Sequence, residues 1–184
     1  MAFPINTKNI NALEREIRWL EAYLESKLMS YFREDREEAS EVAKLAAPDL
    51  SGGSSEYEGI VQESNLSESE RLVLVLALAP YIRPQALDLL LVSNTASSRS
   101  FTEFGGVKVS DHAGFLPSVD TALFLVSSND IARRLEAVQL FSKSSKLHRR
   151  NLISIMYPEK EPWTSARLNP SEELLVRLSL IPKW

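Results

Sequence analysis

Apolar residues recur at helical spacing in residues 7–32. They follow one another at intervals of three and four with charged residues between them, which predicts one long helix with a heptad seam. Such a helix would be about 39 Å long at about 1.5 Å per residue. The seam favours either packing on the chain's own core or association with a second helix, and the pattern leaves both open. The seam residues are Ile10, Leu13, Ile17, Leu20 and Leu24.

This helical pattern ends before a stretch of different composition. Residues 33–47 stay helix-compatible and highly charged, so the first predicted unit is a charged helical segment over residues 1–47. Pro48 then opens a run rich in Gly, Ser and acidic residues, a composition that breaks helices and is typical of flexible connections. We therefore predict a flexible acidic linker over residues 48–66.

Residues 67–184 carry shorter apolar segments. Ser67 and Glu70 have the spacing of a capping box, which predicts an apolar helix over residues 68–81. In the segment 130–141, apolar side chains recur on one helical face, from Ile131 and Leu135 to Phe141. Residues 93–114 show no regular pattern. Further helices are expected over residues 85–92, 122–126 and 169–182, and a pair of strands over 151–157 and 163–168.

The order of these elements is several helices, a hairpin and a final helix. That order suits a winged-helix arrangement. The predicted fold class is therefore mainly α (α+β): a winged-helix-like domain over residues 67–184 with a small β-hairpin, preceded by a long N-terminal helix.

Composition excludes several kinds of site. The 184 residues include no cysteine, which excludes disulfides, thiol catalysis and cysteine zinc sites. His112 and His148 are the two histidines, too few for a multi-histidine metal site. We therefore expect no metal and no cofactor.

Net charge and hydropathy limit which partners and which compartment are expected for the protein. The formal net charge of −4 argues against attraction of the whole chain to DNA or to a membrane. Residues 51–70 hold five acidic residues and no basic ones, so the acidity belongs to the N-terminal third. The longest strongly apolar run, residues 72–80, is too short to span a bilayer, and no signal peptide is visible. A cytoplasmic protein is expected.

One loop offers aromatic and glycine residues together. Phe101, Phe104, Gly105 and Gly106 are a candidate contact for a partner protein, with the aromatic rings as anchors. A tight turn is the alternative, because paired glycines permit positive φ. A phosphate-binding loop is not supported, since the glycine spacing and the hydroxyl residue after Lys108 are absent.

No catalytic constellation is evident. His112 lies close to Ser110 and Asp111, but the sequence has no nucleophile-elbow motif, and loop polarity explains these residues better. We therefore predict no catalytic residue, and a chain that is not an enzyme.

Basic residues gather just before the predicted hairpin. In a DNA-binding winged-helix protein, cations at this place could contact phosphates. The alternative is that they stabilise the C-terminal end of the preceding helix. The candidate nucleic-acid contacts are Lys143, Lys146, Arg149 and Arg150.

Six stretches of the chain together resemble a region of a known family: residues 66–80, 83–88, 101–107, 114–118, 121–125 and 133–136. With these stretches the chain resembles the N-terminal winged-helix region that precedes the ATPase module in AAA+ proteins encoded with phage-tail-like contractile injection systems. The resemblance implies a non-catalytic region, and the chain has no Walker A or Walker B motif of its own.

These observations lead to one expected function and one alternative. The resemblance implies a non-catalytic adaptor domain that recruits targets to an AAA+ ATPase or assembles its subunits. Its partner would be an ATPase module or an injection-system component, and the heptad helix could add self-association. The alternative is a winged-helix DNA-binding regulator.

Overall fold

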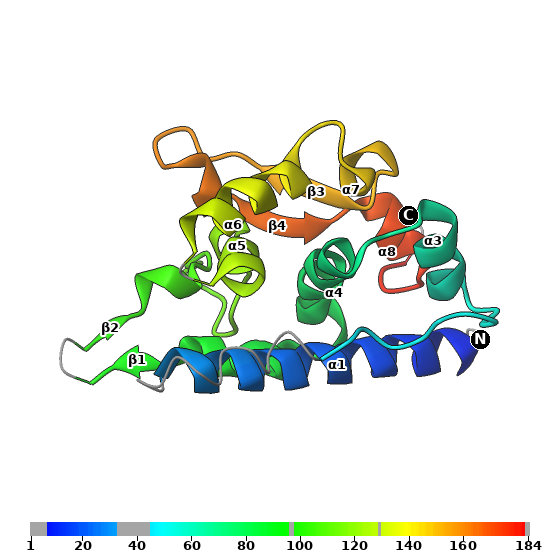
Figure 1. Cartoon of the computed structure of the whole chain (residues 1–184), viewed down its shortest axis with the longest axis horizontal. Helices are drawn as coiled ribbons and strands as arrows, with labels where there is room; N and C mark the ends of the chain where they lie inside the picture. Colours follow the sequence, from blue (N-terminus) through cyan, green and yellow to red (C-terminus); the bar gives the residue numbers. More distant parts are fainter. Residues whose placement is uncertain (1–6, 33–44, 96–97, 129, 183–184) are drawn as a thin grey trace.

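The N-terminal helix runs along one side of the molecule. The computed structural model describes residues 7–32, 45–95, 98–128 and 130–182. Helix α1 covers Thr7–Phe32, as the apolar spacing predicts, and lies beneath the other elements in Figure 1. The rest of the helical segment predicted over residues 1–47 falls mostly outside the described residues.

A helix within residues 48–66 departs from the prediction of a flexible linker. Helix α3, Glu56–Ser64, begins after Ser55, and Ser55 and Glu58 form a capping box. Its residues Tyr57 and Ile60 are buried. The Gly/Ser run over residues 51–55 ends just before this helix, and packing of its few apolar side chains is enough to order a short helix. That the chain divides into separate units here stays a prediction.

Helix α4, Glu68–Ile82, lies at the centre of the fold. The capping box of Ser67 and Glu70 is formed as predicted. Every residue from Leu72 to Ala79 is buried, because α1 covers the helix on one side and the C-terminal hairpin on the other (Figure 1). A helix that is apolar on all sides needs such complete cover.

The segment after α4 is built from short elements. The helix expected over residues 85–92 is a 3-10 helix, η2 (Pro84–Leu91). Strands β1 (Ser93–Asn94) and β2 (Arg99–Ser100) pair as a small antiparallel hairpin, followed by the 3-10 turn η3 (Thr102–Phe104). Their lengths of two and three residues explain why no periodic pattern marks them.

Helices α5 and α6 lie to the left of α4 in Figure 1. Helix α5 (Val119–Ser127) confirms the apolar helix predicted over residues 122–126. The single helix predicted over residues 130–141 is divided into α6 (Ile131–Ala137) and the 3-10 turn η4 (Val138–Phe141), and the short helix α7 (Lys146–Arg149) follows.

The C-terminal hairpin closes the fold opposite α1 (Figure 1). Strand β3 (Ile153–Met156) pairs antiparallel with β4 (Arg167–Pro170), and the turn η5 (Trp163–Ser165) lies in their connection. The return strand therefore begins later than predicted. Ser118 adds a bridge to Arg167 just before α5, and helix α8 (Glu172–Arg177) ends the described elements.

The buried side chains of these elements form one connected cluster that includes residues from α1, α3, α4, α5 and both strands of the C-terminal hairpin. Within the described ranges, no single helix has the length and hydropathy to cross a membrane; α4 and η2 meet that test as a pair bent by 107°.

Candidate functional site

Two consecutive helices with a short turn between them are fixed against the hairpin. Helix α6 begins after Asp130, whose carboxylate accepts a hydrogen bond from the backbone N–H of Arg133 at 3.1 Å. Arg134 of α6 pairs with Asp120 in the first turn of α5 at 2.5 Å. The backbone N–H of Val119 donates to the carbonyl of Ala166 at 3.0 Å, which attaches α5 to β4. The arrangement is a helix–turn–helix pair backed by a β-hairpin.

Helix α6 exposes apolar side chains. Ile131 is 76% exposed and Leu135 is 67% exposed, and their spacing of four residues places them on one face of the helix. Of the seven residues of α6, Ala137 alone is buried. The second helix of the pair therefore presents an apolar face to solvent.

The hairpin beside it exposes apolar residues as well. Met156 at the end of β3 is 70% exposed, and Tyr157 is 59% exposed. The ring of Trp163 in η5 is partly exposed and lies 6.3 Å from the ring of Phe141 in η4. Because η4 continues directly from α6, this contact joins the hairpin to α6. The α6–hairpin surface consists of Ile131, Leu135, Met156, Tyr157 and Trp163.

Charges around the α6–hairpin surface are balanced. Helix α6 carries Arg133, Arg134 and Glu136 next to its cap Asp130, and the connection at residues 159–161 carries two acidic residues and one basic residue. Neutral surroundings do not provide the excess of cations that contact with phosphates requires. Exposed apolar residues grouped on a surface are typical of contact with another protein.

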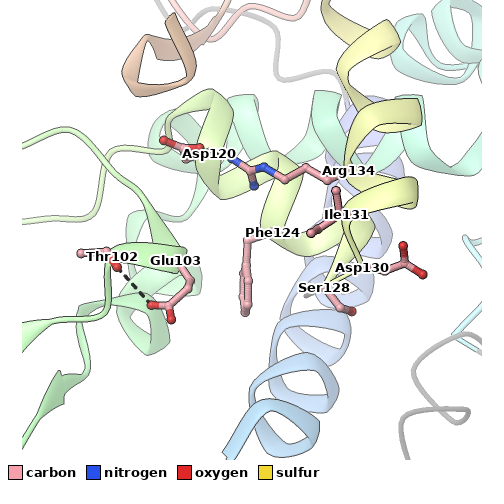
Figure 2. Close-up of a pocket in the computed structure, with 8 residues that line it drawn as sticks. All are labelled: Thr102, Glu103, Asp120, Phe124, Ser128, Asp130, Ile131 and Arg134. Atoms are coloured by element: carbon pink, nitrogen blue, oxygen red, sulfur yellow. Dashed lines mark hydrogen bonds and ion pairs between the residues drawn. The ribbon is translucent and has the colours of Figure 1, made fainter. Parts of the chain in front are cut away.

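A pocket of about 330 Å³ lies beside Ile131 (Figure 2). Phe124 forms an apolar wall, and Glu103 lies on the η3 side. The pocket's carboxylates have structural roles, since Asp120 pairs with Arg134 and Asp130 caps α6. The pocket extends the α6–hairpin surface toward η3. It is lined by Thr102, Glu103, Asp120, Phe124, Ser128, Asp130, Ile131 and Arg134.

The predicted partner-contact loop packs largely inward. Phe104 is 1% exposed, and its ring lies 5.3 Å from that of Tyr31 and 5.0 Å from that of Phe124. Phe101 is partly exposed and lies 5.1 Å from Phe104. The inward position of Phe104 leaves Phe101 as the ring that a partner can reach, and partner contact by this loop stays a prediction.

The two glycines of this loop permit a tight turn against α5. Gly105 has φ +63 and Gly106 has φ +90, a conformation that favours glycine. A Cβ atom at Gly105 would lie 2.5 Å from Oγ of Ser118, the N-cap of α5. The backbone N–H of Gly106 donates to the same Oγ at 3.0 Å.

The heptad seam of α1 is used inside the chain. Leu13, Ile17, Leu20 and Leu24 are buried in the common core, whereas Ile10 is exposed. The structure therefore matches the first of the two open interpretations, packing on the chain's own core. Association through the four buried residues would require α1 to leave the core.

The residues of the predicted basic cluster differ in their contacts within the chain. Lys146 lies 3.5 Å from the carboxylate of Glu70, and Arg150 donates to the carbonyl of Glu63 at 3.4 Å. Lys146 thus connects α7 to α4, and Arg150, the C-cap of α7, connects it to α3. The side chains of Lys143, Arg149 and Arg150 are exposed.

The sequence does not predict that Ile131 and Leu135 are exposed. Helical spacing places them on one face with Phe141, but it does not state whether that face is covered. In the structure Phe141 is buried and the other two are exposed, because the helix changes to a 3-10 turn at Val138 and its direction of packing changes there.

The comparison with known families agrees with this architecture. A family model described as winged helix domain, variant, matches residues 10–169. No curated protein and no solved structure matches the chain.

Proposed function

We propose that the chain, which belongs to the winged helix domain family in its variant form, is a non-catalytic protein-binding module. Membership of this family suggests a domain that binds DNA or protein. The observation that carries this proposal is the exposed apolar face of α6. A helix after a helix–turn–helix turn reads DNA through polar and basic side chains. Here Ile131 and Leu135 occupy that helix, and the hairpin exposes the apolar residues Met156, Tyr157 and Trp163 as well.

We further propose that the partner is an AAA+ ATPase. The resemblance to N-terminal regions of ATPases of contractile injection systems supports this assignment. Two of the stretches that carry it, residues 121–125 and 133–136, lie in α5 and α6. In this proposal the α6–hairpin surface recruits or positions the ATPase module or an injection-system component, and the cytoplasm is the compartment in which it does so.

Binding to a purified AAA+ ATPase module of a phage-tail-like contractile injection system tests this function. The double variant Ile131→Ser and Leu135→Ser should weaken the affinity at least about tenfold, because central apolar contacts dominate interface energies. Calorimetric titration of the full chain against the module measures the effect.

Leu91→Ser provides the matched control. Leu91 is an exposed leucine of η2, outside the α6–hairpin surface, and its change should leave the affinity unaltered. An equal loss in both variants, or no loss in the double variant, contradicts the assignment of the surface. Absence of binding by the unaltered chain contradicts the assignment of the partner.

The DNA-binding alternative has one observation in its favour. Lys143 and Arg149 are exposed close to the hairpin, since α7 contacts β3. If they contact phosphates, affinity for a duplex should fall steeply as salt rises. Fluorescence anisotropy with a labelled duplex, before and after Lys143→Glu and Arg149→Glu, separates this alternative from protein binding.

A further inference from the structure

A lysine of α1 reaches into the turn that precedes α6. The side chain of Lys27 is buried, and its Nζ donates to the carbonyl of Leu125 at 2.7 Å and to Oγ of Ser128 at 2.5 Å. One turn earlier on α1, the hydroxyl of Tyr23 donates to the same carbonyl at 3.1 Å. Two side chains of the N-terminal helix thus hold the end of α5.

The residue that they hold has an unfavourable backbone conformation. Ser128 has φ 54 and ψ −134, which side-chain-bearing residues rarely adopt. Its N–H donates to the carbonyl of Phe124 at 3.0 Å, and its Oγ accepts from Lys27. Surrounding contacts must offset this strain, and the hydrogen bond from the amino group of Lys27 is one of them.

The charge of Lys27 has no carboxylate partner among the described residues. Its Nζ lies 5.8 Å from the centre of the Phe124 ring. The carboxylates on α6 and α5 have other roles, since Asp130 caps α6 and Asp120 pairs with Arg134. Burial lowers the pKa of Lys27 to about 8, and the positive charge of Arg133 adds to the shift. On the η3 side, Glu103 lies near the hydroxyl of Tyr31.

We propose that Lys27 and Tyr23 form a latch through which α1 fixes the position of α6, and that release of the latch loosens the α6–hairpin surface. The proposal rests on the proposed function in one respect, that α6 contacts a partner. Release of the latch is measured without a partner, so the latch proposal and the proposed function can each fail independently.

The buried charge makes this latch a weak contact of the fold. A proton is held less tightly in the latched state than in the released, solvated state, so protonation favours release. The latch therefore tightens as pH rises from about 8 toward the ordinary lysine value of 10.5, and it is weakest at and below neutral pH. Between about pH 7.5 and about pH 9.5 the released population should fall on the order of tenfold.

Methyl relaxation dispersion on the full chain tests the latch. Exchange at the methyl groups of Leu125 and Ile131 should decrease over this pH range, while Ile60 in α3 serves as the reference. Lys27→Met should abolish the pH response, and Tyr23→Phe should keep it while increasing exchange. Lys8→Met, which removes an exposed lysine at the other end of α1, is the matched control.

Two results would overturn the proposal. One is the same pH response in the Lys27→Met variant. The other is a response in the unaltered chain that is equal at Ile60 and Ile131, since that would report general loosening of the core. The second result needs no variant, so the proposal stays testable even if Lys27→Met does not fold.

Discussion

At the scale of single residues, a buried ion pair connects three helices. The carboxylate of Glu16 is fully buried and accepts hydrogen bonds from the hydroxyl of Tyr57 at 2.7 Å and from the guanidinium of Arg71. Arg71 also donates to the carbonyl of Pro48 at 2.9 Å. Burial raises the pKa of the Tyr57 phenol well above its ordinary value, and the charge of Glu16 adds to the shift. These contacts join α1, α3 and α4.

Glu16→Gln should lower the free energy of unfolding by about 3 kcal/mol, because it leaves the guanidinium of Arg71 buried without a compensating charge. Urea denaturation measures the change. Glu14→Gln is the control, since Glu14 pairs with Arg83 and Arg18 at the surface and its loss should lower the free energy of unfolding much less than Glu16→Gln does. Equal losses of unfolding free energy in both variants would show that the buried Glu16–Arg71 pair stabilises the fold no more than a surface pair does.

At the scale of elements, α1 stabilises the fold through the buried residues of its heptad seam. Its buried leucines and isoleucine contact α3, α4 and η2, and its Lys27 holds the turn before α6. The heptad spacing that suggested a partner helix is explained by packing within the chain. A helix of this length buries a stripe of the same spacing whether its partner is its own core or another chain.

Leu20→Ala distinguishes the two interpretations of the seam. Leu20 is fully buried, so the substitution should lower the free energy of unfolding by about 2–5 kcal/mol through lost burial and a cavity. Thermal or urea denaturation measures this, and light scattering measures the mass. A change in mass at unchanged stability would instead support association through α1. Ile10→Ala, at the exposed seam position, should alter stability by less than about 0.5 kcal/mol.

At the scale of the whole molecule, a single core spans the position where the sequence suggests a linker. Side chains before and after residues 48–66 belong to the same buried cluster, and Arg177 of α8 lies 2.7 Å from Glu56 of α3. In Figure 1 the C-terminal hairpin lies on the side opposite α1, and α4 lies between the hairpin and α1.

The shared core should make unfolding one cooperative event. Urea transitions followed by far-ultraviolet and by near-ultraviolet circular dichroism should coincide, because α1 and the helical body lose their common contacts together. Two separated transitions would favour the division at residues 48–66 into independently stable units.

Local patterns in the sequence predict the long helix, the capped apolar helix α4 and the C-terminal hairpin, and the order of these elements predicts the winged-helix class. Each rests on local information: helical spacing, a capping box, or alternation before a proline. Local patterns predicted a helix at η2 but not its 3-10 form. They could not give β1, β2 or α7, which are too short for a period to appear. They missed α3 because a stretch rich in Gly, Ser and acidic residues precedes and masks it.

Only the tertiary structure decided which apolar faces are covered. The same helical spacing marks Leu20, which is fully buried, and Leu135, which is 67% exposed. The tertiary structure also decided that Phe104 packs inward. It likewise decided that Lys27, which no sequence pattern marks, reaches the turn before α6. The physical reason is that burial depends on what lies opposite a side chain. Elements distant in sequence supply that neighbour, and no local pattern records it.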